Sequence, residues 1–171
     1  VVPLLFNNTV SGKNVSIVVK KEQLHKAVNV IHSEIFGISK KINIAIFGHG
    51  WVGGTLINQI INSKDDIEKR KGIKLNIFAV ANSKKVLFDR NGVSENWKTN
   101  IVDNGKPYEV DDVIDFAKQH HLENLIAIDN TASKDFVSNY IKLAENGFDL
   151  VSSNKIANTI GLDFYDELRE V

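Results

Sequence analysis

Several features are missing from this sequence, and each absence excludes a class of function. There is no cysteine among the 171 residues, which excludes disulfides, thiolate catalysis and cysteine-based zinc sites. There is no net charge, because 21 Lys and Arg balance 21 Asp and Glu, so we expect no nucleic-acid partner. Four of the five histidines have no ligand partners at metal spacing, namely His25, His32, His120 and His121, and His49 lies in a glycine-rich loop, so we expect no metal.

Long apolar runs are also missing. No run approaches the ~18–20 residues that span a bilayer, and no signal peptide opens the chain. These absences predict a cytoplasmic protein with no membrane partner. Methionine is absent and the chain begins with Val1, which suggests a piece of a longer protein. The length predicts about one domain with some material to spare.

The first 41 residues carry a pattern of their own. Residues 14–19 are rich in β-branched side chains and predict a strand. An amphipathic helix follows, with apolar residues at i, i+4, i+7 and i+11 and a glycine where a C-cap belongs: Leu24, Val28, Ile31, Ile35 and Gly37. Because a strand and a helix cannot close a core alone, we expect the end of a domain here, followed by a short linker at 38–41.

From Ile42 the chain alternates between strands and helices. Near-continuous apolar runs predict buried strands at 42–47, 74–82, 124–131 and 148–155. Helical spacing predicts helices at 55–70, 110–121 and 134–147, and from 162 onward. Residues 83–106 read as a long connection of turns. This alternation predicts an α/β fold, a Rossmann-type doubly wound parallel sheet over 42–171.

A glycine motif stands at the end of the first predicted strand of this series. The stretch IAIFGHGWVGG places Gly48, Gly50 and Gly53 as G-x-G-x-x-G. The first glycine allows a tight turn, the second lets the backbone approach a pyrophosphate, and the third allows close helix–strand packing. The strand before the motif and the helix after it favour dinucleotide binding. The alternative is a tight turn with a purely structural role.

The end of the second strand bears on the choice of dinucleotide. A site for NAD usually has an Asp or Glu there for the ribose 2′-hydroxyl. This chain has Ala81, Asn82, Ser83, Lys84 and Lys85 instead. A hydroxyl and two cations without a carboxylate suit a 2′-phosphate, so the sequence favours NADP over NAD. The alternative is a solvated basic turn.

Polar residues also follow the two later strands. The stretch AIDNTAS places Asp129, Asn130, Thr131 and Ser133 at the carboxyl end of a buried strand, where they would meet the nicotinamide half of a dinucleotide. Ser133 could also cap the next helix. Lys155, in SSNKIAN, follows the last strand. Taken alone, it is more simply a surface lysine.

Together these motifs resemble homoserine dehydrogenase. The residues that carry the resemblance are, in order, IAIFGHGWVGG, VANSK, IDNTAS and LVSSNKIANT. The resemblance implies NAD(P)-dependent interconversion of aspartate semialdehyde and homoserine in threonine and methionine synthesis. It places the pyrophosphate loop on Gly48 to Gly53, which includes His49, Trp51 and Val52. It places dinucleotide contacts on Asn130 and Thr131 with Ala132 beside them, and a lysine near cofactor and substrate on Lys155, the candidate catalytic residue.

The first 41 residues resemble the last strand and helix of an ACT regulatory domain, as in a fused aspartokinase–homoserine dehydrogenase. The family places its main substrate-binding and proton-transfer residues in a second domain that follows this sequence. We therefore expect dinucleotide binding without turnover, a small-molecule substrate, and a homo-oligomeric parent protein. Two alternatives stay open: a non-catalytic dinucleotide-sensing module, and the cofactor domain of another small-carbonyl dehydrogenase.

Overall fold

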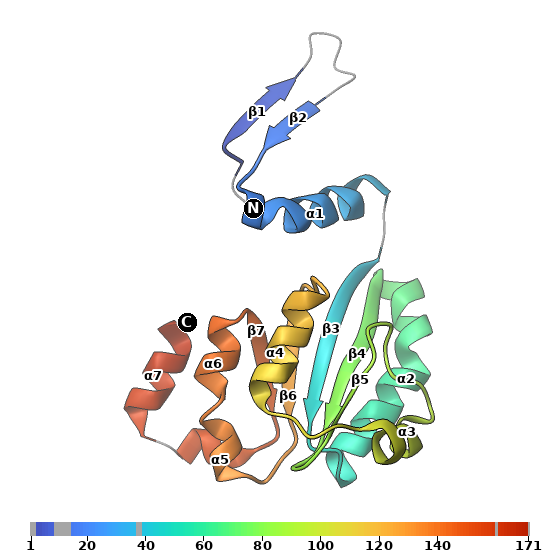
Figure 1. The fold of residues 1–171 in the computed structure, drawn as a ribbon, viewed down its shortest axis with the longest axis vertical. Helices are drawn as coiled ribbons and strands as arrows, with labels where there is room; N and C mark the ends of the chain where they lie inside the picture. Colours follow the sequence, from blue (N-terminus) through green and yellow to red (C-terminus); the bar gives the residue numbers. More distant parts are fainter. Residues whose placement is uncertain (1–2, 9–14, 37–38, 160, 171) are drawn as a thin grey trace. The chain divides into compact units, whose positions relative to one another are not determined.

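The computed structural model describes residues 3–8, 15–36, 39–159 and 161–170 (Figure 1). The chain divides into two compact units, Val1–Lys40 and Lys41–Val171.

The first unit is a hairpin followed by a helix. Strand β1 (Leu5–Asn8) pairs antiparallel with β2 (Val15–Val18), and a 3-10 turn η1 (Lys21–Gln23) leads into α1 (Leu24–Phe36). The predicted strand and helix are confirmed as β2 and α1, whereas β1 was not predicted. Gly37 lies outside the described residues. That this unit is the end of an ACT-like domain stays a prediction.

The second unit is built on a five-stranded sheet in the order β5-β4-β3-β6-β7. Its strands are β3 (Lys40–Phe47), β4 (Ile73–Ala81), β5 (Val86–Phe88), β6 (Leu125–Asp129) and β7 (Phe148–Ser152). Strand β6 runs parallel to both β3 and β7. Figure 1 draws β3 and β4 in the same direction. Strand β5 is antiparallel to β4, so the sheet is mostly parallel with an antiparallel edge.

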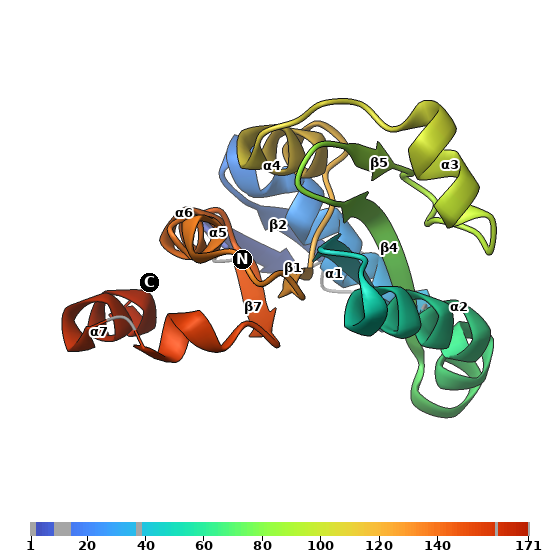
Figure 2. The same ribbon diagram turned by 90° about the horizontal axis from the view of Figure 1, so that it is seen from below.

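Helices cover both faces of this sheet, α2 and α3 on one side and α4, α5 and α6 on the other (Figure 2). Their bounds are α2 (Trp51–Lys71), α3 (Trp97–Asn104), α4 (Val110–Gln119), α5 (Lys134–Val137) and α6 (Tyr140–Glu145). A 3-10 segment η2 (Lys155–Thr159) and the last helix α7 (Leu162–Glu170) follow β7, and α7 packs beside α6. The predicted doubly wound arrangement is confirmed.

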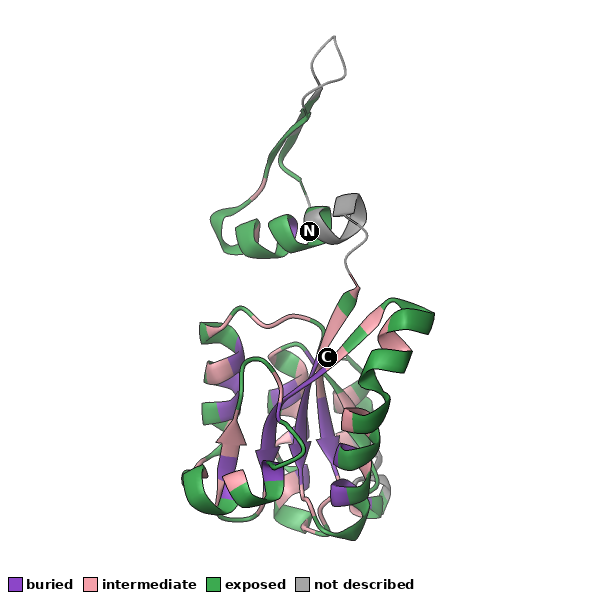
Figure 3. Ribbon diagram, turned by 90° about the vertical axis from the view of Figure 1, so that its right-hand side faces the viewer, coloured by how far each residue is buried: buried purple, intermediate pink, exposed green. Residues whose placement is uncertain are grey.

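The side chains of β3 explain why two helical layers are needed. Ala45 and Phe47 belong to an apolar cluster with α4 and α6, whereas Ile44 and Ile46 belong to a second cluster with α2 and α3. All four are buried, because successive strand residues point to opposite faces. Figure 3 shows the same result, with buried strands inside and the outer helix surfaces exposed.

Residues 83–106 differ from the prediction of a long run of turns, because they contain both β5 and α3. The chain reverses at a tight turn in which the Asn82 N–H donates to the Lys85 carbonyl at 2.9 Å. A reversal this short can only bring the chain back antiparallel to β4. Strand β5 forms the edge of the sheet. Helix α3 then forms because Trp97 and Ile101, one turn apart, are both buried against the sheet.

The predicted helix 134–147 is two helices, α5 and α6. Between them Ser138 Oγ donates to the Asp135 carbonyl at 2.7 Å, and Asn139 Nδ2 donates to the Phe136 carbonyl at 3.1 Å. Such side chains compete with backbone N–H groups for helix carbonyls, so the helix stops and restarts here.

Candidate functional site

The strand order reverses at β3, with β4 on one side and β6 on the other. In open α/β sheets, ligands bind outside the carboxyl ends of the strands at this switch point. The predicted motifs converge there, because the Gly48 N–H donates to the Ala81 carbonyl at 2.8 Å and the Asn130 N–H donates to the Phe47 carbonyl at 2.8 Å. The glycine loop therefore joins the ends of β4 and β6.

Two glycines of the loop are required by packing. Gly48 has φ +86, and a Cβ there would lie 2.8 Å from the Asn130 carbonyl carbon and oxygen. A Cβ on Gly53 would collide with the Gly48 carbonyl oxygen. Both positions bring backbone segments so close together that only glycine fits.

Gly50 is different, because a Cβ there would meet nothing within 4 Å. It is the N-cap of α2, it has no side-chain cap, and the first turn of α2 holds no acidic residue. The helix N-terminus thus keeps free N–H groups and an uncompensated positive dipole beside open space. This is the arrangement that binds a phosphate, so the loop fits a dinucleotide pyrophosphate.

Trp51 and Val52 form the first turn of α2. Trp51 begins the helix, as predicted, and its side chain is 92% exposed. Val52 is also exposed. These two side chains face outward at the start of the helix, and neither belongs to the pocket described below.

The turn after β4 is organised by the Asn82 side chain. Its Oδ1 accepts hydrogen bonds from the backbone N–H groups of Lys84 and Lys85, both at 2.8 Å. The Tyr108 hydroxyl donates to the Asn82 carbonyl at 3.1 Å, and burial raises the pKa of Tyr108 to about 12. Ala81 is buried at the strand end, while Ser83 and Lys84 are exposed.

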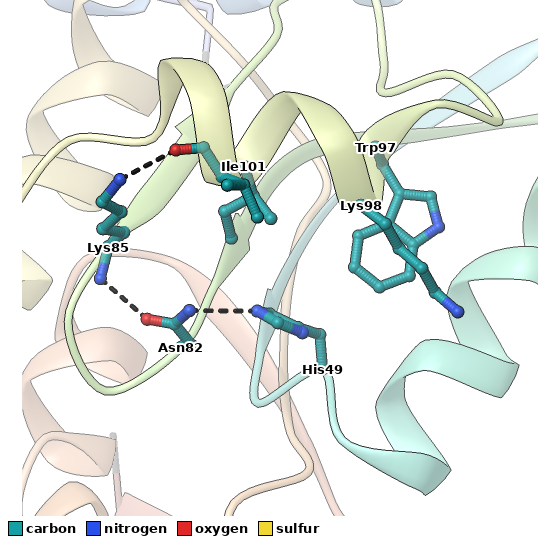
Figure 4. A pocket seen from close by; sticks show the side chains of 7 residues that line it. His49, Asn82, Lys85, Trp97, Lys98 and Ile101 are labelled. Atoms are coloured by element: carbon teal, nitrogen blue, oxygen red, sulfur yellow. Dashed lines mark hydrogen bonds between the residues drawn. The ribbon is translucent and has the colours of Figure 1, made fainter.

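A pocket of about 430 Å³ opens beside this turn (Figure 4). It is lined by the glycine loop, the turn and α3, through His49, Asn82, Lys85, Trp97, Lys98, Ile101 and Val102. Lys85 Nζ donates to the Val102 carbonyl at 2.9 Å, and Lys98 Nζ lies 5.6 Å from the centre of the Trp97 ring. No carboxylate lines the pocket, so its charged groups are cationic.

Sequence reasoning named Lys85 as a cation of the turn but missed the whole contribution of α3 to this pocket. Residues 83–106 contain two turn-forming pairs, Asn91 with Gly92 and Asn104 with Gly105, and these pairs hide the short helix. The available signal was the four-residue spacing of Trp97 and Ile101.

The carboxyl end of β6 carries a buried polar network. Asp129 is 3% exposed, and its carboxylate accepts from the Thr131 N–H at 2.7 Å, from the Tyr140 hydroxyl at 2.6 Å and from Asn154 Nδ2 at 3.1 Å. Ser152 Oγ lies 2.8 Å from the Tyr140 hydroxyl. Burial, followed by the hydrogen bond to Asp129, raises the pKa of the Tyr140 phenol. The network ties the loop after β6 to the loop after β7.

The predicted contacts after β6 lie in this loop. Ser133 caps α5, as the structural alternative proposed, with Oγ accepting from the Phe136 N–H at 3.2 Å, and Ala132 is exposed. Asn130 Oδ1 accepts from Ser153 Oγ at 3.1 Å, while its Nδ2 is buried without a hydrogen-bond partner among the described residues. The loop after β6 therefore has an N–H donor, Asn130 Nδ2, without a partner in the described part of the chain, directly beside the glycine loop.

Lys155 follows Asn154, which is hydrogen-bonded to this loop. Asn154 Nδ2 donates to the Ser133 carbonyl at 2.9 Å, and Lys155 follows as an exposed residue at the start of η2. It does not line the pocket. The structure thus brings the glycine loop, the turn after β4 and the loop after β6 together, and leaves Lys155 at the periphery.

The described residues contain no group of three or more His, Cys, Asp or Glu side chains that could hold a metal ion. No helix in the described part of the chain is both long and apolar enough to cross a membrane.

Comparison with known proteins identifies one family for this chain. The family model of the homoserine dehydrogenase NAD-binding domain matches residues 48–171. Bifunctional aspartokinase/homoserine dehydrogenases from Buchnera aphidicola and Haemophilus influenzae are each 34% identical over 161 residues. Each match covers 94% of this chain and 20% of the relative, so the chain spans about one fifth of the length of these relatives.

Solved structures show the same fold. The homoserine dehydrogenase of Thermoplasma acidophilum superposes with a TM-score of 0.58 at 22% identity, covering 77% of this chain and 41% of that one. A hyperthermophilic archaeal homoserine dehydrogenase in complex with NADPH gives a TM-score of 0.54 at 22% identity, covering 76% and 40%.

Proposed function

Because this chain belongs to the homoserine dehydrogenase family, as its NAD-binding domain, we propose that it holds the dinucleotide for interconversion of L-homoserine and L-aspartate 4-semialdehyde. The observation that carries the proposal is the open space at Gly50 beside the uncapped N-terminus of α2. When bound, the nicotinamide would donate or accept the hydride, while the protein supplies orientation and electrostatics.

Each part of the dinucleotide has a matching group of residues. The pyrophosphate would bind the N–H groups at Gly48 to Gly53, a loop that includes His49, Trp51 and Val52. The adenosine ribose would meet the turn of Ala81, Asn82, Ser83 and Lys84. The nicotinamide half would lie at the loop after β6, with Asn130, Thr131, Ala132 and Ser133. Lys155 is the candidate for contact with both cofactor and substrate.

We propose NADP as the preferred dinucleotide. The turn after β4 presents the Ser83 hydroxyl and the Lys84 ammonium to solvent, and no carboxylate is present to repel a 2′-phosphate or to bind a 2′-hydroxyl. Lys85 is already committed to the Val102 carbonyl. Lys84 is therefore the free cation of this turn, and we assign the 2′-phosphate to Ser83 and Lys84.

Titration calorimetry with NADPH and NADH tests both parts of the proposal. We expect NADPH to bind more tightly, and Lys84→Ala to lower its affinity about tenfold, because a charge-assisted contact is worth ~1.4 kcal/mol or more. The loss should shrink at high salt. Lys118→Ala, which alters an exposed residue of α4, is the matched control. Tighter binding of NADH would contradict the NADP preference, and binding of neither would contradict the site.

For the whole protein, we propose a bifunctional enzyme of threonine and methionine biosynthesis that also carries aspartate kinase activity, in a cytoplasmic homo-oligomer. The family match and the bifunctional relatives support this over a sensing module or another small-carbonyl dehydrogenase. The 171-residue chain itself is expected to bind dinucleotide without oxidising homoserine. A dehydrogenase assay beside the calorimetry decides this, and normal turnover by this chain would contradict it.

A further inference from the structure

The orientation of the Asn82 side chain is fixed by its own turn. Its Oδ1 accepts two backbone N–H groups, from Lys84 and Lys85. Because an N–H can only donate, the atom facing them must be the carboxamide oxygen. The Asn82 Nδ2 therefore points away from the turn, and it lies 3.1 Å from Nε2 of His49 (Figure 4).

This orientation fixes the role of the His49 ring. An amide NH₂ group only donates, so Nε2 of His49 must accept and must carry no proton. In this hydrogen bond the ring proton lies on Nδ1, the tautomer set by its hydrogen-bond partner. The ring is also held by an edge contact with Trp97, whose centroid lies 5.4 Å away. These two contacts therefore hold Nε2 of His49 in position without a bound ligand.

We propose that His49 is a positioning residue that ties the glycine loop to the turn after β4, and so sets the affinity for the 2′ substituent of the adenosine ribose. The inference rests on the proposed function and extends it. His49 acts through Asn82, which in turn holds the backbone of Lys84. The loop that would bind pyrophosphate and the turn that would bind the 2′ group are thus one connected unit.

Removing the acceptor should release this turn. Without Nε2, the Asn82 carboxamide keeps its two hydrogen bonds from the Lys84 and Lys85 N–H groups, but it loses its bond to the glycine loop. The turn can then shift relative to that loop. Ser83 and Lys84 would then have to be ordered at the moment of binding, which lowers affinity. The N–H groups of the glycine loop do not depend on this bond, because α2 and the end of β6 hold the loop separately.

Three variants and a control separate this role from general damage. His49→Phe keeps a ring beside Trp97 and removes the acceptor, whereas His49→Gln restores an acceptor oxygen on a flexible chain. Asn82→Ala removes the same link from the other side, together with the two hydrogen bonds inside the turn. His120→Phe is the matched control, because its ring contacts Phe116 at the C-terminus of α4. Calorimetry with NADPH and with NADH is run on each variant, with a thermal melt to check folding.

We expect His49→Phe to lower the affinity for NADPH about five- to tenfold, the range for one net hydrogen bond, and that for NADH less than twofold. His49→Gln should recover most of the loss. Asn82→Ala should lower the affinity for NADPH at least as much, because it also removes the two hydrogen bonds from the Lys84 and Lys85 N–H groups. The double variant His49→Phe with Asn82→Ala should bind no more weakly than Asn82→Ala alone, because Asn82→Ala already removes the bond to His49. NMR of the imidazole nitrogens should show the His49 proton on Nδ1.

Equal losses for NADPH and NADH, no loss in either, additive losses in the double variant, or a proton on Nε2 would each overturn the inference. If the unchanged chain binds neither dinucleotide, the proposed function fails first. If it binds and the variants do not separate NADPH from NADH, the inference alone fails.

Discussion

At the scale of single residues, the glycine motif contains three different physical requirements. Gly48 combines a positive φ with a close approach to Asn130, and Gly53 lies against the Gly48 carbonyl. Gly50 has an ordinary φ of −64 and open space around it. The first two are therefore required by the folded backbone alone, whereas Gly50 is exposed to solvent and the folded backbone makes no such demand there.

Alanine substitution should separate these roles. We expect Gly50→Ala to leave the free energy of unfolding within ~0.5 kcal/mol of the original and to lower dinucleotide affinity at least about tenfold, because its Cβ would occupy the path of the pyrophosphate. Gly53→Ala should lower the free energy of unfolding by about 1–3 kcal/mol through overpacking. Urea denaturation and calorimetry measure both. Unchanged binding by Gly50→Ala would show that the open space has no such role.

The same scale shows why some side chains could be assigned from sequence and others could not. Ser133 stands directly before a predicted helix, so its cap was foreseeable and is confirmed. Tyr140 gave no signal, because its partner Asp129 lies eleven residues away on another element. Local spacing finds caps and turns, whereas cross-element hydrogen bonds depend on how the elements pack.

At the scale of elements, α3 decides the shape of the pocket. Ile101 is 3% exposed and packs against the sheet, whereas its neighbour Val102 is 67% exposed. Both residues line the pocket, but only the first anchors the helix. The helix is eight residues long, too short to be stable alone, so its position depends on the residues that it buries.

Alanine substitutions at Ile101 and Val102 can be compared directly, because the two residues are neighbours in α3 and differ in burial. We expect Ile101→Ala to lower the free energy of unfolding by about 2–5 kcal/mol, the range for a buried isoleucine. Val102→Ala should change it by no more than ~0.5 kcal/mol, as for an exposed residue. Urea denaturation followed by circular dichroism measures both. Similar effects at the two positions would mean that α3 is not held by its buried face.

At the scale of the whole molecule, the apolar cores are unevenly distributed. Both core clusters lie entirely within residues 41–171. In the first unit, Ala27 is the buried apolar residue among the described side chains, and Leu24, Val28 and Ile31 are 49%, 49% and 39% exposed. The stability of the described chain therefore comes from the second unit.

A shortened chain of residues 41–171 is expected to fold on its own. It should unfold in a single cooperative transition, with a melting temperature within a few degrees of the full chain, and it should bind the same dinucleotide with the same affinity. A chain of residues 1–40 should show no cooperative unfolding, because segments of ~40 residues rarely bury enough surface. Calorimetric melts of the two pieces measure this. Loss of folding in 41–171 would contradict the assignment of stability.

The sequence by itself determined the alternation of strands and helices, the doubly wound sheet and the glycine loop, because each follows from periodicity or from a local backbone demand. It also placed the polar residues at the strand ends. Only the tertiary structure decided that residues 83–106 fold back as β5 and α3, that Trp97 and Ile101 close a pocket, and that His49 accepts a hydrogen bond from Asn82. These contacts join residues far apart in the chain, and their geometry is set by packing.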